Sequence, residues 1–257
     1  MSLVDWTVMD GSLDGTNWVG TIVKRGVTSG ISGPPGSTHF VFGFNSTQIT
    51  DGAVAISCSI ANFGPIEPRP VHSGSGGGGG SIRGCVKRGQ SAGKTGFSPF
   101  LFIGANLNDV QATTYMLGLE DADPNRIVLV KGQIQHGVPS VDAPGTQTVL
   151  RCSQNVYDWD KWHHLRLDMI VNDNGDVVLY AYENDLDTNN CNAPVWTPIE
   201  FNDGLEYPDG VYVDDSLGVM TESDPLLSGY LGFGFEVSNS ARRGYFDHME
   251  VMRQKAP

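Results

Sequence analysis

Hydrophobic and polar residues alternate in short runs along this chain, most clearly between Trp162 and Glu183. Asn174-Gly175 separates two apolar runs there, and Asn-Gly favours a two-residue β-hairpin turn. Such a turn pairs Arg166 with Glu183 across the two strands, as opposite charges prefer. It also places these side chains on one apolar face: Leu167, Met169, Val171, Val178, Tyr180 and Tyr182. The pattern therefore predicts a complete hairpin, with that face on the core and the other partly exposed to water.

Further runs of this kind lie on either side of the hairpin, and each is bounded by Gly, Pro, Asn or Asp. They predict strands over residues 37–45, 52–60, 81–88, 97–105, 115–120, 126–134, 148–156, 229–237 and 244–253. Leu231, Phe233, Phe235 and Val237 share one face of their run. Spacings of about 8–12 residues, without a helical period, predict an all-β protein, either a two-sheet antiparallel β-sandwich or a barrel.

Three stretches lack this alternation. Residues 1–36 carry Gly, Ser and Pro without a regular pattern, so we expect an irregular N-terminal arm. Residues 62–81, with five consecutive glycines, predict a flexible loop, and residues 184–224, rich in Asp, Asn and Pro, predict a long one. Because β-sandwiches of about 200–250 residues commonly form one domain, we expect a single domain over residues 37–257.

The overall charge narrows the choice of partners. A formal net charge of −13 disfavours nucleic acid and anionic lipid, which proteins bind mainly through Lys and Arg. No apolar run approaches the roughly 20 residues that cross a bilayer, and the first residues lack the pattern of a signal peptide. We therefore expect no nucleic-acid or membrane partner, and synthesis in the cytoplasm without signal-directed export.

The four cysteines, Cys58, Cys85, Cys152 and Cys191, are far apart and form no Cys-x-x-Cys motif. Their spacing indicates neither a zinc site nor a redox pair. Cys58 is in phase with the apolar residues of its run, as a small core residue would be. The residues leave two states open: four free thiols, as in a reducing cytosol, or one disulfide.

Two segments carry a resemblance to known domains. Trp162–Leu165, followed by an alternating strand and an Asn-Gly hairpin, resembles the Trp-His-hydrophobic strand of laminin-G-like and concanavalin A-like jelly rolls. The chain also ends as those domains do, with a Gly-x-Leu-Gly-Phe-Gly-Phe strand, a polar turn and Tyr245–Asp247. Asp123–Leu129 and the C-terminal half resemble jelly-roll proteins encoded among tailed-phage structural proteins. From about residue 97 onward, the resemblance implies a concanavalin A-like jelly roll.

Jelly rolls include lectins, glucanases, lyases and structural modules, so catalysis has to be sought in particular residues. A glycosidase that retains the configuration of the sugar needs two carboxylates about 5 Å apart. Glucanases of this fold carry them on one strand as Glu-x-Asp-x-Glu. The nearest candidate, Glu183–Asp185, lies at a strand end and is interpreted as a solvated or ion-paired edge. Asp247 stands where the lyases would have lysine. His136 lies in a loop and could be a base, but its Gln-Ile-Gln-His run is one residue longer than the Gln-Ile-His of the lyases. We assign no catalytic residue and expect no enzyme.

Metal ligation is expected at one position. His163 and His164 are strand neighbours whose side chains point to opposite faces, so they cannot chelate one ion together. We interpret both as structural. Asp247 matches the aspartate that binds a structural calcium in the glucanases that this ending resembles, and the alternative is a solvated turn acid. No other cofactor is expected.

Three functions remain open. We expect a non-enzymatic structural subunit of a larger assembly. The expected assembly is a phage virion, in which the protein would form part of the capsid or tail as a homo-oligomer. Trp6 and Trp18 are the expected interface residues, since tryptophan combines a large apolar area with one donor. The alternatives are a module that binds surface glycans on a concave sheet face, with ligand-binding residues unknown, and a polysaccharide-cleaving glucanase or lyase. Exposed aromatic rings beside polar groups would favour glycan binding, and two close carboxylates in a cleft would favour the enzyme.

Overall fold

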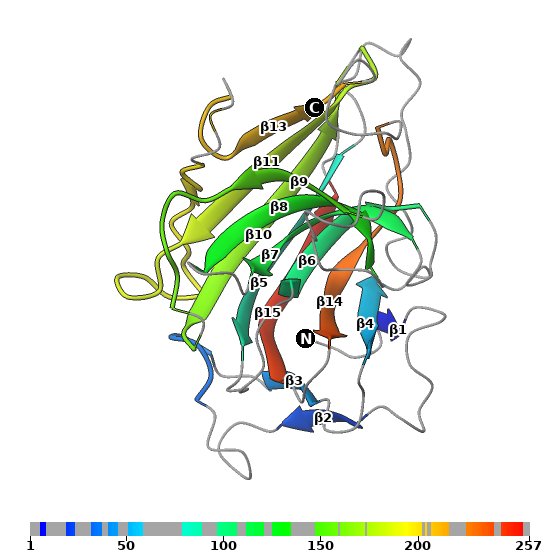
Figure 1. Cartoon of the computed structure of the whole chain (residues 1–257). Helices are drawn as coiled ribbons and strands as arrows, with labels where there is room; N and C mark the ends of the chain where they lie inside the picture. Colours follow the sequence, from blue (N-terminus) through cyan, green and yellow to red (C-terminus); the bar gives the residue numbers. More distant parts are fainter. Residues whose placement is uncertain are drawn as a thin grey trace.

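A computed structural model gives the fold of the chain, which is built of β-strands (Figure 1). It describes residues 6–8, 19–23, 32–37, 41–45, 51–58, 79–88, 97–106, 112–120, 125–134, 147–158, 160–172, 174–201, 204, 207–215, 225–238 and 243–253. The strands are β1 (Trp6–Val8), β2 (Val19–Val23), β3 (Val41–Asn45), β4 (Asp51–Cys58), β5 (Gly79–Arg88), β6 (Phe97–Ala105), β7 (Thr113–Glu120), β8 (Arg126–Gln133), β9 (Gln147–Cys152), β10 (Trp162–Val171), β11 (Val177–Asn184), β12 (Thr197–Pro198), β13 (Val211–Asp214), β14 (Tyr230–Ser238) and β15 (Arg243–Arg253). Within these described ranges, no helix has the length and apolar character to cross a bilayer.

The strands form two antiparallel sheets (Figure 1). The first, here the β6 sheet, has the order β1-β4-β14-β6-β7-β8-β9. The second, here the β10 sheet, has the order β12-β11-β10-β5-β15-β3-β2, with β13 also beside β11. Consecutive strands such as β5 and β6, or β14 and β15, lie in different sheets, as in a jelly roll. The predicted all-β fold, a two-sheet antiparallel β-sandwich of the concanavalin A-like jelly-roll type, is therefore confirmed.

The main core lies between the sheets. Leu165, Leu167 and Met169 of β10 point into it, and Phe233 and Phe235 of β14 meet them from the other sheet. Burial of each such side chain contributes about 1.5–3 kcal/mol. The far face of the β6 sheet carries a second apolar cluster: Phe100, Phe102, Ala105, Ala112, Met116, Val128, Val130 and Ile134. The far face of the β10 sheet, here called the outer face, carries polar and aromatic side chains instead.

The expected irregular arm contains two short strands. β1 pairs with β4 and β2 pairs with β3, so each adds to a sheet. The sequence pattern missed Val19–Val23 because five residues are too few to show a clear alternation, although the run is rich in β-branched residues that favour strands. Residues 1–36 are thus not wholly irregular, and the domain boundary at residue 37 stays a prediction.

Two predicted loops also contain strand residues. Gly79 and Gly80, the last of the five glycines, are buried in β5 and pair with Ile170 and Met169. Glycine is typical of loops, but its backbone makes the same ladder hydrogen bonds as any other non-proline residue. The long loop, residues 184–224, contains β12 and β13, both of which pair with β11.

The turn between β10 and β11 has three residues, not the predicted two. Asn172 N–H donates to the Asp176 carbonyl over 2.9 Å, and Gly175 N–H donates to the Asn172 carbonyl over 3.1 Å. Gly175 has a φ of 86°, the left-handed conformation that closes a type I turn with a bulge. The Asn172 side-chain oxygen accepts the N–H groups of Asn174 and Asp176, both at 2.9 Å. The three-residue turn forms because the Asn172 side chain accepts hydrogen bonds from the backbone N–H groups of the turn.

This one-residue difference moves the side chains of β11 to the opposite face relative to the prediction. Arg166 pairs with Tyr182 and not with Glu183, and Asp168 pairs with Tyr180. The core side of the hairpin consists of Leu165, Leu167, Met169, Val171, Val177, Leu179 and Ala181. The predicted apolar face is correct for β10 and wrong for β11, whose two tyrosines lie on the outer face.

The three-residue turn predicts unequal effects of alanine at its neighbouring positions. Gly175→Ala should lower the free energy of unfolding by about 1–2 kcal/mol, since the left-handed conformation costs an L-residue that amount. Asn174→Ala should change it by less than about 0.5 kcal/mol, because Asn174 does not adopt a positive φ. Urea unfolding followed by circular dichroism measures both. Equal losses would indicate a two-residue turn, in which both positions need positive φ.

Candidate functional site

The alignment of β11, β10, β5 and β15 builds the outer face. Residues paired across these strands form three rows: Asn184–His164–Cys85–Asp247 in the first, Tyr182–Arg166–Arg83–Glu250 in the second, and Tyr180–Asp168–Ser81–Met252 in the third. Side chains directly opposite on neighbouring strands share a face. The fold thereby joins residues as distant as Arg83 and Glu250, which are 167 positions apart.

Two arginines at the centre of the second row are each held by a carboxylate. Arg166 donates from Nε and Nη2 to the two oxygens of Asp168, over 2.8 and 2.6 Å. Arg83 donates from Nε and Nη2 to one oxygen of Glu250, over 3.0 and 2.5 Å. The side chains of Arg166 and Arg83 are 26% and 24% exposed. These contacts fix each guanidinium plane and balance its charge, while part of each group still faces solvent.

Aromatic rings lie beside Arg166. Tyr180 and Tyr182 stack at 12° between planes, with ring centroids 6.5 Å apart. The Arg166 guanidinium lies 5.3 Å from the ring centroid of Tyr182 and 6.0 Å from that of Trp196, which follows β11 in the chain. All three rings are half-buried. Burial, followed by the charge of Asp168, raises the pKa of Tyr182, so its hydroxyl stays protonated and available for hydrogen bonds at neutral pH.

The first row is buried and supports the second. Asn184 Nδ2 lies 3.1 Å from Nδ1 of His164. Burial, with smaller contributions from Arg83 and His248, lowers the pKa of His164 to about 3, so its imidazole is neutral at physiological pH. The His164 ring lies 4.6 Å from that of Trp196 between centroids, which helps to hold the indole beside the arginines.

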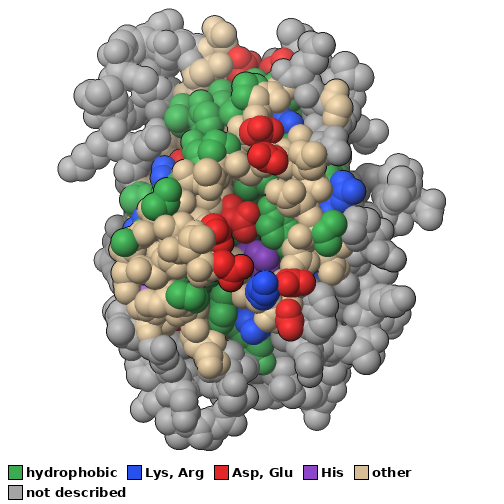
Figure 2. Space-filling model, turned by 90° about the vertical axis from the view of Figure 1, so that its left-hand side faces the viewer, with side chains coloured by type: hydrophobic (Ala, Val, Ile, Leu, Met, Phe, Trp, Pro, Cys, Tyr) green, Lys and Arg blue, Asp and Glu red, His purple; other side chains and the backbone are tan. Residues whose placement is uncertain are grey.

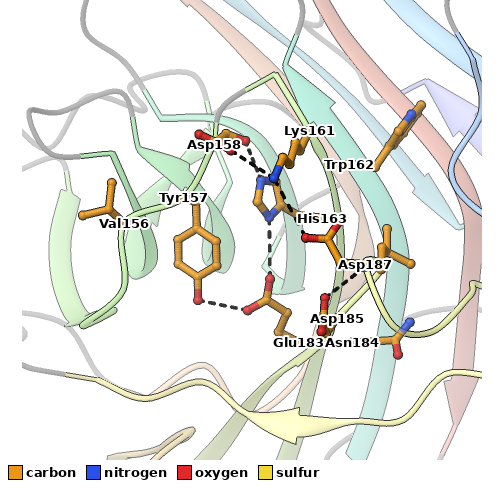
Figure 3. Close-up of a pocket in the computed structure, with 11 residues that line it drawn as sticks. Val156, Tyr157, Asp158, Lys161, Trp162, His163, Glu183, Asn184, Asp185 and Asp187 are labelled. Atoms are coloured by element: carbon orange, nitrogen blue, oxygen red, sulfur yellow. Dashed lines mark hydrogen bonds and ion pairs between the residues drawn. The ribbon is translucent and has the colours of Figure 1, made fainter.

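A pocket of about 250 Å³ opens where β10 begins and β11 ends. Figure 2 shows acidic side chains around a hollow, with histidine and Lys or Arg side chains beside them, on the face that it displays. In the pocket, Tyr157 and His163 point toward Glu183, and Trp162 points away (Figure 3). The Tyr157 hydroxyl donates to Oε2 of Glu183 over 2.9 Å, and His163 Nδ1 lies 3.6 Å from Oε1.

Three titratable side chains of the pocket are each engaged by a neighbouring group. Nε2 of His163 lies 2.9 Å from the carbonyl oxygen of Asp158, so Nε2 donates its hydrogen there. Burial and the neighbouring Glu183 raise the pKa of Tyr157 above its usual range, so it does not supply a phenolate base. Lys161 at the pocket wall is 3.1 Å from Asp158. The pocket is therefore a polar recess of mixed charge.

Asp247, the predicted calcium ligand, is buried on β15 in the first row. Its carboxylate accepts hydrogen bonds from the Ser37 hydroxyl and, over 2.8 Å, from the His248 backbone N–H. In the part of the chain that the structure describes, no group of three or more His, Cys, Asp or Glu side chains that could hold a cation includes Asp247. A calcium ion at Asp247 stays a prediction.

The other predicted positions have different outcomes. His163 and His164 point to opposite faces of β10, as predicted, since His163 meets Asp158 and His164 meets Asn184. Glu183, at the strand end, accepts the Tyr157 hydroxyl. The following positions lie outside the described residues, wholly or in their side chains: Trp6, Trp18, Cys58 and His136.

The sequence gives no local motif for the centre of the outer face. Arg83 and Arg166 belong to strands that are distant in the chain and become neighbours only through the sheet. The two-residue turn places Tyr180 and Tyr182 in the core, away from Arg166. Asn172, an asparagine able to bond the backbone two residues on, is the one signal for the wider turn and hence for this face.

No protein-family model matches the chain, and no curated protein matches it. Solved structures that align with it include the carbohydrate-binding module CBM66 from Bacillus subtilis, at 12% identity and a TM-score of 0.45, over 96% of this chain and 94% of that one. A PL-14 alginate lyase from Aplysia kurodai aligns at 10% and 0.45, over 94% and 88%. The CBM2 module of an evolved Dit protein from Lactobacillus casei BL23 phage J-1 aligns at 12% and 0.42, over 100% and 94%. Likeness at this level concerns the fold and says nothing of what this chain binds.

The two ion pairs of the outer face should differ in their effect on stability. The Asp168 side chain is 6% exposed, whereas that of Glu250 is 50% exposed. Asp168→Asn should lower the free energy of unfolding by about 1–3 kcal/mol, because it leaves a buried charged hydrogen bond unmade. Glu250→Gln, the matched control, should change it by less than about 0.5 kcal/mol, since water screens exposed pairs. Chemical denaturation of both variants measures this, and similar losses would contradict the burial of Asp168.

Proposed function

We propose that this protein is a glycan-binding module and that the second and third rows of the outer face form its binding surface. The observation that carries the proposal is the pair of half-buried rings of Tyr182 and Trp196 beside the fixed Arg166, with Tyr180 stacked on Tyr182. Arg83 is the strand partner of Arg166 and shares this face. A pyranose ring presents C–H groups on its faces and hydroxyls around its rim. Flat aromatic rings accept the former, and oriented guanidinium and carboxylate groups bind the latter.

The charge balance of the face favours a neutral glycan. Arg166 and Arg83 are each paired with a carboxylate, so neither is a free cation that attracts an acidic sugar. The net charge of −13 also repels acidic polysaccharides at a distance. Neutral polymers or oligosaccharides are therefore the proposed ligands.

The proposed module binds its glycan without cleaving it. A retaining glycosidase needs two carboxylates about 5 Å apart, one of them a free nucleophile. In the described rows of the outer face, Asp168 and Glu250 are each engaged by an arginine. In the pocket, the raised pKa of Tyr157 and the Asp158 contact of His163 oppose a role as base. We therefore propose a non-enzymatic module.

The predicted role as a structural subunit of a virion is a separate matter. It depends on Trp6 and Trp18 as contact residues, and their side chains lie outside the described residues. No contact of a described residue favours that role over glycan binding. A glycan-binding face would suit an adhesion protein of such an assembly, so the two proposals are compatible.

Affinity gel electrophoresis with neutral polysaccharides tests the proposed function. The native chain should be retarded by at least one of them, and Tyr182→Ala should weaken binding at least about tenfold, equivalent to 1.4 kcal/mol. Tyr157→Phe is the matched control, because Tyr157 lines the pocket and not the outer face. Equal binding by native protein and Tyr182→Ala, or retention lost only in Tyr157→Phe, would move the site away from the outer face.

A further inference from the structure

Three side chains with metal-binding atoms meet at the buried end of the outer face. Cys85 comes from β5, His164 from β10 and Cys191 from the segment after β11. One donor atom from each lies within 4.8 Å of the others, and all three residues are buried. Two thiols and one imidazole are the ligand set of zinc and similar thiophilic ions. We propose that Cys85, His164 and Cys191 form a binding site for a thiophilic divalent cation of the zinc class.

The backbone fixes the positions of the three residues. Cys85 and His164 are direct partners across β5 and β10, so their side chains share the outer face. Cys191 is held by its own N–H, which donates to the Pro35 carbonyl over 3.0 Å. The turn around it is closed by Asn190, whose side-chain oxygen accepts two backbone N–H groups at 2.9 Å. The cluster is therefore preorganised by strand pairing and by an ordered turn.

Asn184 contacts the histidine ring, but with its amide nitrogen, whereas the outer partner of a metal-bound imidazole accepts the hydrogen of the second ring nitrogen. Its Nδ2 lies 3.1 Å from His164 Nδ1, and its Oδ1 accepts the Val195 N–H over 2.9 Å. A cation bound at Nε2 leaves the ring proton on Nδ1. Asn184 must then turn its amide so that the oxygen accepts that proton, which gives up the bonds of Oδ1 with the Val195 N–H and of Nδ2 with the Asn190 carbonyl. The amide turn is a structural consequence of binding through Nε2.

The charges at the site balance when a divalent cation binds. Burial, followed by the neighbouring Cys191 thiol, raises the pKa of Cys85 well above its usual value. A divalent ion takes the place of the two thiol protons, which pass to solvent, and the resulting site of one cation, two thiolates and neutral His164 has no net charge. Neutrality matters because an unbalanced charge is costly to bury.

The sequence spacing indicates no such site, since it has no Cys-x-x-Cys motif. The cluster arises because the fold joins residues 85, 164 and 191. A cation there would tie the segment after β11 to the sheet, and this segment carries Trp196 against His164. The proposal does not depend on glycan binding, and its measurements involve no glycan.

Cobalt(II) titration of the full-length reduced chain, followed by absorption spectroscopy, tests the site. One cobalt ion per chain should bind, with the charge-transfer bands of thiolate ligation. Cys85→Ser, Cys191→Ser and His164→Asn should each weaken binding by more than about 100-fold, beyond the loss typical of outer-shell partners. Cys152→Ser is the matched control, because Cys152 lies outside the cluster, and it should bind cobalt as the native chain does.

Zinc and thermal unfolding provide a second measurement if a serine variant fails to fold. Zinc at a hundredfold excess over its Kd should raise the Tm of the native chain by on the order of 5–10 °C. No rise in Tm, together with no cobalt thiolate band, would overturn the proposal. So would a disulfide between Cys85 and Cys191 in the protein isolated from cells, seen as a mass lower by two hydrogens and by the linked peptides.

Discussion

The alternation of side chains along β10, held in register by β5 on one side and β11 on the other, is the constraint on which the rest of the structure depends. β10 pairs with both neighbours over most of its length. Leu165 and Leu167 therefore enter the core, and Arg166 and Asp168 reach the outer face. A shift of one residue would expose leucines and bury an ion pair, at a cost of several kcal/mol. The register that builds the core thus also builds the candidate binding face.

A second contact ties β11 to the rest of the molecule. β13 pairs with β11 and carries Asp214, which forms a buried ion pair with Lys131 of the opposite sheet over 2.6 Å. The Tyr115 hydroxyl also donates to Asp214, and burial, followed by that carboxylate, raises the pKa of Tyr115. Arg151 donates to the Val211 carbonyl over 2.5 Å. Buried pairs of this kind favour one geometry more than they add stability, and here the geometry keeps β13 at the edge of β11.

Much of the fold could be predicted from the sequence, because the alternation shows where strands run and which of their residues share a face. Phe97–Ala105 is a strand over the predicted residues, and the core positions of β10 are correct. Strand propensity and local composition gave wrong predictions where pairing with a distant strand decides the local structure. Gly79 and Gly80 look like a loop but are held in β5 by β10.

The candidate site was less accessible to sequence reasoning than the fold. Its centre depends on a one-residue choice at Asn174-Gly175, decided by the hydrogen bonds of the Asn172 side chain. The cysteine and histidine cluster depends on the pairing of Cys85 with His164 between β5 and β10, and on the hydrogen bond that holds Cys191 to Pro35. No local spacing reveals either contact. Both features follow from contacts between distant parts of the chain. The alternation of residues along one strand carries no information about such contacts.

The central claim is that the register of β10 creates a ligand-binding face beside Arg166. The most direct test is a nuclear magnetic resonance titration with a neutral oligosaccharide that the protein binds. The Nε–H signal of Arg166 and the indole N–H signal of Trp196 are followed during the titration. Both signals should shift in proportion to occupancy, while the backbone N–H signals of Tyr157 and His163 stay in place. Shifts confined to Tyr157 and His163, with Arg166 and Trp196 unchanged, would contradict the account and assign binding to the pocket.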